Sequence, residues 1–133
     1  MMNIEEAIKS LHEQVKQDIV AAEALQKAEC YSQALFWAHL VLEKMCKALW
    51  VKKNNKAEYP FTHNLLRLFK ECNVELNEEQ TKFYSDMNLF QSLGRYDDSI
   101  QTIEDTISEK VCQEFMNQFK IEYQWIAIQI QEK

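Results

Sequence analysis

Residues 31–63 read YSQALFWAHLVLEKMCKALWVKKNNKAEYPFTH, and this stretch decides the fold. Its first two thirds are apolar at nearly every helical position. A helix that is apolar all round has no face for water, so it must be buried in a bundle core or an oligomer interface. The stretch then passes through a lysine-rich connection and ends at Thr62 and His63.

One polar line crosses this apolar helix. His39, Glu43 and Lys47 are four residues apart and therefore share a helical face. Two interpretations remain open. The line is either a helix-stabilising Glu–Lys pair beside a hydrogen-bonded core histidine, or a polar surface in a cleft that binds phosphate or a nucleobase.

The composition predicts a single all-α domain over residues 1–133. Hydrophobic residues make up 47% of the chain, and it has one glycine and one proline. So few chain breakers favour long helices and exclude glycine-rich phosphate loops. The net charge of −6 argues against a protein whose main task is non-specific binding to nucleic-acid backbones, although a local basic patch remains open.

The four cysteines are far apart in the sequence and form no C-x-x-C pair. We therefore expect free, buried thiols in a reducing cytoplasm. The charged, amphipathic N-terminus is unlike a secretory signal. The longest apolar run, residues 34–38, is too short to cross a membrane.

Hydrophobic periodicity predicts an up-and-down bundle of four long helices and one short helix. The long helices cover residues 4–28, residues 32–53 with Ser32 as N-cap, residues 77–93, and a stretch that begins between residues 99 and 102 and carries an apolar stripe from Ile107 to Ile130. Asn77 and Gln80 form a capping-box-like pair, and Gly94 stops that helix. The short helix covers residues 63–72, with Thr62 as its N-cap.

Two further candidate sites lie in connections. Lys52, Lys53 and Lys56 precede Thr62 and His63, and phosphate is attracted by lysines and by a helix N-terminus. A solvated loop with Thr62 as a plain N-cap is the alternative.

Arg95 and Tyr96 follow Gly94 at a corner between helices. Arg95 either pairs with a nearby acid or reaches the cleft as a phosphate ligand. No metal site or cofactor is expected, because the three histidines have no ligand spacing to one another.

The residues in this order resemble the HEPN domain family. The resemblance rests on Tyr31-x-x-Ala34-x-x-x-Ala38-His39, Glu43-Lys44-x-x-Lys47-Ala48, Thr62-His63-Asn64-Leu65 and Arg95-Tyr96-Asp97-Asp98, where many members have proline at the position of Asp97. It implies a homodimer and a nucleotidyltransferase companion, often as a toxin–antitoxin pair. Several branches of the family are metal-independent endoribonucleases marked by Arg-x(4–6)-His.

That motif is absent from this chain, because its only arginines are Arg67 and Arg95 and no histidine follows His63. We therefore expect a cytoplasmic nucleotide- or RNA-associated binding module rather than an enzyme. Two alternatives stay open. One is an endoribonuclease toxin that uses non-standard residues, with Arg95 and His63 or His39 as candidates, and the other is a purely structural helical dimer.

Overall fold

The computed structural model describes residues 2–93 and 107–132. All regular secondary structure in these two ranges is helical: α1 (Ile4–Lys27), α2 (Tyr31–Asn54), α3 (Leu65–Glu71), α4 (Glu78–Leu93) and α6 (Glu109–Gln131). Four of these helices are long and α3 has seven residues. The predicted all-α bundle of four long helices and one short helix is confirmed.

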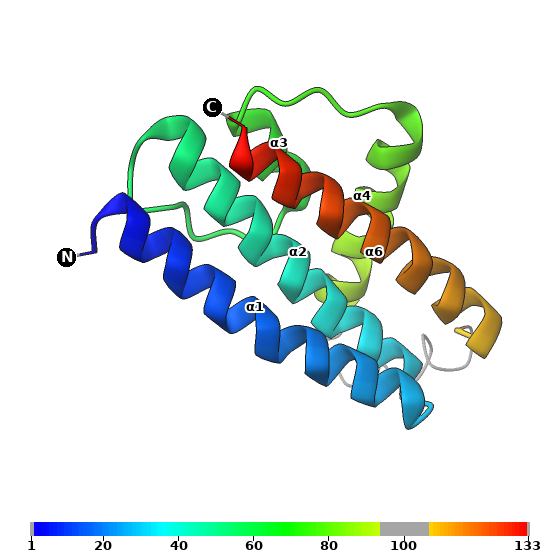
Figure 1. The fold of residues 1–133 in the computed structure, drawn as a ribbon. Coiled ribbons are helices and arrows are strands. Elements are labelled where there is room, and N and C mark those ends of the chain that lie inside the picture. Colours follow the sequence, from blue (N-terminus) through cyan, green and yellow to red (C-terminus); the bar gives the residue numbers. More distant parts are fainter. Residues whose placement is uncertain (1, 94–106, 133) are drawn as a thin grey trace.

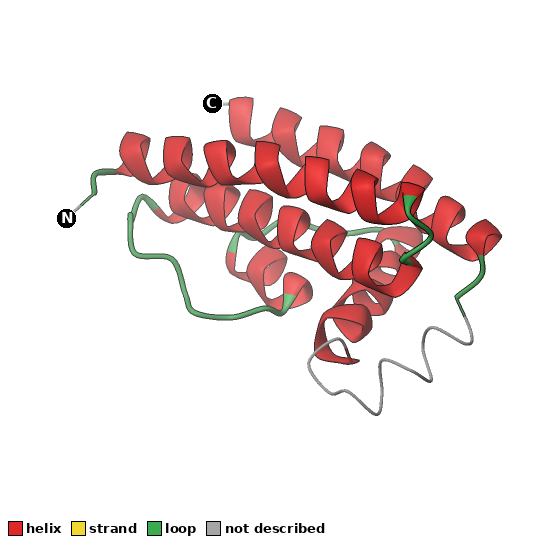
Figure 2. Cartoon of the chain, turned by 90° about the horizontal axis from the view of Figure 1, so that it is seen from below, coloured by secondary structure: helices red, strands yellow, loops and turns green. Residues whose placement is uncertain are grey.

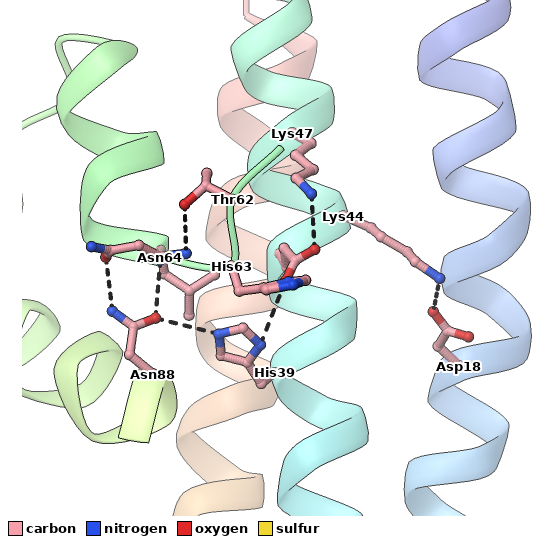
Figure 3. A network of polar contacts seen from close by, with 10 residues as sticks. Asp18, His39, Lys44, Lys47, Thr62, His63, Asn64 and Asn88 are labelled. Carbon is pink, nitrogen blue, oxygen red and sulfur yellow. Dashed lines mark hydrogen bonds and ion pairs between the residues drawn. The ribbon is translucent and has the colours of Figure 1, made fainter. Parts of the chain in front are cut away.

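Helix α2 is the centre of the molecule. It lies between α1 and α6, with α3 and α4 packed on its remaining side (Figures 1 and 2). Of its 24 residues, 15 are buried, as the all-round apolar sequence requires. An ion pair between Lys44 and Asp18, with Nζ and Oδ2 2.6 Å apart, joins α2 to α1 (Figure 3).

The chain directions follow the up-and-down pattern. Lys52 near the end of α2 donates hydrogen bonds to the backbone oxygens of Ile130 and Glu132, so α2 and α6 run the same way. Helix α4 contacts α6 through one buried carboxylate. Glu122 of α6 is buried and accepts hydrogen bonds from Tyr84 Oη (2.7 Å) and Gln80 Nε2 (3.0 Å) of α4.

Several helix ends differ from the sequence prediction. Asn77 and Gln80 do exchange hydrogen bonds at the start of α4, at 2.7 and 3.2 Å. Ser32 is not an N-cap, since α2 already begins at Tyr31 and Ser32 is buried inside it. The last helix begins at Glu109, where Ser108 Oγ accepts the backbone N–H of Val111 (3.1 Å). The expected start between residues 99 and 102 lies outside the described residues.

Thr62 is not the N-cap of α3, and His63 is not in its first turn. Asn64 is the N-cap, with its Oδ1 accepting the backbone N–H of Arg67 at 3.3 Å. The Thr62 hydroxyl instead accepts the backbone N–H of Asn64 at 3.2 Å. Thr62 therefore closes a turn in the connection, and α3 starts two residues later than predicted.

Candidate functional site

Five of the seven predicted site residues gather in one place. His39, Glu43 and Lys47 face the connection between α2 and α3, residues 55–64, and Thr62 and His63 approach them from that connection (Figure 3). The convergence follows from the four-residue spacing on α2, which aims three polar side chains at one neighbour. We refer to this group, with Asn64 and Asn88, as the α2–loop cluster.

Glu43 is the charge centre of the cluster. Its Oε2 accepts a hydrogen bond from Lys47 Nζ at 2.9 Å, and its Oε1 lies 2.7 Å from His63 Nδ1. Glu43 is 5% exposed and Lys47 is 6% exposed. A buried carboxylate or a buried ammonium group is tolerated only when it is paired. Here the Glu43 carboxylate and the Lys47 ammonium group pair with each other.

His39 lies at the base of the cluster with no exposed surface. Its Nε2 is 3.3 Å from Asn88 Oδ1, which also accepts the backbone N–H of Leu65 at 3.0 Å. Because Asn88 Oδ1 can only accept, the imidazole carries its hydrogen on Nε2. His39 Nδ1 is 3.9 Å from Glu43 Oε1, too far for a hydrogen bond.

Burial lowers the pKa of His39 to about 4, against the opposing effects of the Glu43 carboxylate, Asn88 and the backbone of His63. The side chain is therefore neutral at pH 7. A neutral, fully buried histidine cannot contact a ligand in this arrangement. His39 therefore has the role of a hydrogen-bonded core histidine, which was one of the two interpretations of the sequence.

Asn88 of α4 is a member of the cluster that sequence reasoning missed. Its Nδ2 donates to Asn64 Oδ1 at 2.9 Å while its Oδ1 holds the backbone of Leu65. The one available signal was its place one helical turn after Tyr84, on the side of α4 that faces the bundle. Without the tertiary fold, nothing in the sequence couples residue 88 to residues 39 and 64.

Two aromatic side chains beside the cluster were also missed. Phe61 is 94% exposed, and its ring meets the His63 ring edge-on with centroids 5.9 Å apart. Tyr59 is also exposed, and Lys47 Nζ lies 5.4 Å from the centre of its ring. Two aromatic rings that reach solvent thus lie beside the polar cluster.

The three lysines at the end of α2 and just after it have different roles. Lys52 is bound to the carboxyl end of α6, so it is held away from any ligand. Lys53 and Lys56 are exposed and form no ion pair with any described residue. Lys53 and Lys56 therefore remain candidates for a phosphate contact, and Lys52 does not.

Comparison with known proteins identifies the architecture. A model of the HEPN domain matches residues 8–129, which is nearly the whole chain. The chain belongs to the HEPN domain family. Neither the curated proteins nor the solved structures contain a significant match.

In this HEPN domain, Arg95 and Tyr96 lie outside the described residues, so their place relative to the cluster remains a prediction. The described part holds no group of three or more His, Cys, Asp or Glu side chains that could bind a metal ion. None of its helices is both long and apolar enough to cross a membrane.

The four cysteines are free, and Cys46, Cys72 and Cys112 are buried. Burial raises the pKa of Cys72 and of Cys112 to about 11, and it raises the pKa of Cys46 well above its ordinary value. These three thiols are therefore protonated and unreactive, as expected of core residues in this HEPN domain.

Proposed function

We propose that this HEPN domain is a cytoplasmic nucleotide- or RNA-binding module that works as a homodimer with a nucleotidyltransferase-type partner, in the manner of a toxin–antitoxin pair. Family membership supports the nucleotide or RNA association. The homodimer and the nucleotidyltransferase-type partner are carried over from the resemblance of the sequence alone. The four unpaired cysteines support a reducing compartment. The absence of Arg-x(4–6)-His from the sequence favours binding over catalysis.

One observation carries the proposal: the buried Glu43 pairs with both Lys47 and His63. In this pairing the charged side chains of the cluster bind one another. The contact with His63 also fixes the connection, residues 55–64, against α2. Lys53 in the last turn of α2 and Lys56 in the connection are exposed to solvent. The cluster is thus suited to shape a binding surface rather than to donate reactive groups.

Titration calorimetry of the purified protein with ATP and with short single-stranded RNA tests the binding role. We expect saturable binding that weakens with added salt, because phosphate contacts release counterions. The RNA should remain intact when metal ions are chelated. Absence of binding to both ligands would overturn the proposed function.

Sedimentation velocity and co-expression with a nucleotidyltransferase-type protein encoded beside this chain test the assembly. We expect a dimer in sedimentation velocity. We also expect the dimer to co-purify with the affinity-tagged partner. A monomer at micromolar concentration that leaves the partner unbound would contradict this part of the proposal.

Metal-independent RNA cleavage is a second candidate function, favoured by the contact of 2.7 Å between Glu43 and His63. A carboxylate that orients an imidazole is a common arrangement for general acid–base chemistry. Cleavage that is lost in His63→Ala would support this function. Wild-type protein that leaves RNA intact in the presence of a chelator would exclude it.

A further inference from the structure

The Phe61 ring is the most exposed large apolar side chain of the described residues, at 94%. Burying such a ring would stabilise the fold, and leaving it in water forgoes that stabilisation. Single exposed apolar residues are common in proteins and carry no functional meaning alone. Phe61 differs in two respects. Hydrogen bonds hold the backbone on both sides of it, and it lies in a segment with positive net charge.

The backbone on both sides of Phe61 is held in place. Thr62 N–H donates to Pro60 O at 3.1 Å, and the Thr62 hydroxyl accepts Asn64 N–H at 3.2 Å. His63, which meets the Phe61 ring, is fixed to the buried Glu43 at 2.7 Å. The backbone that carries the ring is therefore positioned before any ligand arrives, which lowers the entropic cost of binding.

The charge of the chain is distributed unevenly along the sequence that carries these rings. Residues 43–71 hold seven lysines and arginines against three glutamates, a local net charge of +4 in a chain whose total is −6. Lys53 and Lys56 lie within this segment, are exposed and have no ion-pair partner in the described ranges. An anionic strand would be attracted to this segment and repelled by the rest of the sequence.

We propose that Tyr59 and Phe61 form a stacking platform for unpaired nucleobases, with Lys53 and Lys56 attracting the phosphates. The inference rests on the proposed nucleotide- or RNA-binding function and names the groups that would perform it. Sites for single-stranded nucleic acid combine these same elements, positive charge and solvent-facing aromatic rings. The base is held through its π-face, so little sequence preference is expected.

Three substitutions at one position separate stacking from simple apolar contact. Phe61→Leu keeps an apolar side chain but removes the ring, Phe61→Ala removes both, and Phe61→Trp keeps a ring that reports through its fluorescence. Because Phe61 is exposed, none of these changes should alter the thermal unfolding midpoint. Ile121→Ala on α6, another exposed apolar position, is the matched control.

Fluorescence anisotropy with a short labelled oligouridylate measures the effect. We expect Phe61→Leu and Phe61→Ala to weaken RNA binding by about 5- to 150-fold, with Phe61→Trp and Ile121→Ala near wild type. The Phe61→Trp fluorescence should be quenched by the oligouridylate but not by an abasic oligomer of equal length. Quenching by free UMP as well would identify a single nucleotide as a sufficient ligand.

The outcomes separate this inference from the proposed function. Wild-type binding of RNA that persists in Phe61→Leu would overturn stacking and leave the proposed function standing. Failure of the wild type to bind any nucleotide or RNA would overturn both. Loss of self-association in Phe61→Leu with unchanged RNA binding would assign the ring to a protein interface and contradict the platform.

Discussion

At the scale of single residues, the site depends on Glu43, whose two carboxylate oxygens serve Lys47 and His63. Glu43→Gln leaves the buried Lys47 ammonium group without its counter-charge. We expect the free energy of unfolding to fall by about 3 kcal/mol, measured by urea denaturation. Asp86→Asn, which breaks the exposed pair of Asp86 and Lys82, should cost less than about 1 kcal/mol. Equal losses in the two variants would contradict the account of Glu43.

His39 predicts a specific pH dependence of stability. Its pKa is about 4 in the folded chain, against 6.5 for an ordinary histidine, so between these values only the unfolded chain binds the proton. Its contribution is complete above about pH 6.5 and is lost as the pH falls toward 4, by up to about 3 kcal/mol. Urea denaturation across this range should show a shallower dependence for His39→Gln. Identical pH profiles would contradict a neutral, buried His39.

At the scale of elements, α3 depends on contacts from outside itself. A helix of seven residues is too short to be stable alone, and Asn64 and Asn88 satisfy backbone N–H groups at its start. Asn88→Ala should therefore speed amide hydrogen exchange throughout α3 and reduce stability by about 1 kcal/mol. Asn77→Ala, at the start of α4, is the control and should leave exchange in α3 unchanged. Amide exchange rates in α3 that are unchanged by Asn88→Ala would contradict this role of Asn88.

The helices of this chain could be predicted from sequence better than their ends could. Helix α2 is apolar on nearly every side, and α1 carries one apolar stripe. Burial of these residues largely determines how the two helices pack. Thr62 and Asn64 are both good N-caps by residue type. The choice between them is made by Asn88, which is 24 residues away from Asn64 in the sequence.

The candidate site was predictable in part for the same reason. The spacing of His39, Glu43 and Lys47 is local, so their shared face could be read directly. Their meeting with Thr62 and His63 was not predicted, because it depends on the path of the connection over α2. The exposure of Phe61 depends on how the connection folds back over α2, which no local pattern encodes.

At the scale of the whole molecule, charge placement matters more than net charge. The double reversal Lys53→Glu with Lys56→Glu should weaken RNA binding and flatten its salt dependence, because two phosphate contacts are lost. Lys9→Glu with Lys16→Glu on α1 changes the net charge by the same amount at exposed positions and is the control. Equal weakening by both pairs, measured by anisotropy over a salt series, would contradict a localised site.

Binding of nucleic acid through the connection between α2 and α3 is what we propose for this HEPN domain. Its most direct test is a titration of the isotope-labelled protein with single-stranded oligouridylate, followed by amide chemical shifts in two-dimensional NMR spectra. We predict saturable shifts concentrated in residues 52–64, with the outer face of α1 unaffected. Shifts that are absent, or that concentrate on α1 or α6 instead, would contradict the claim.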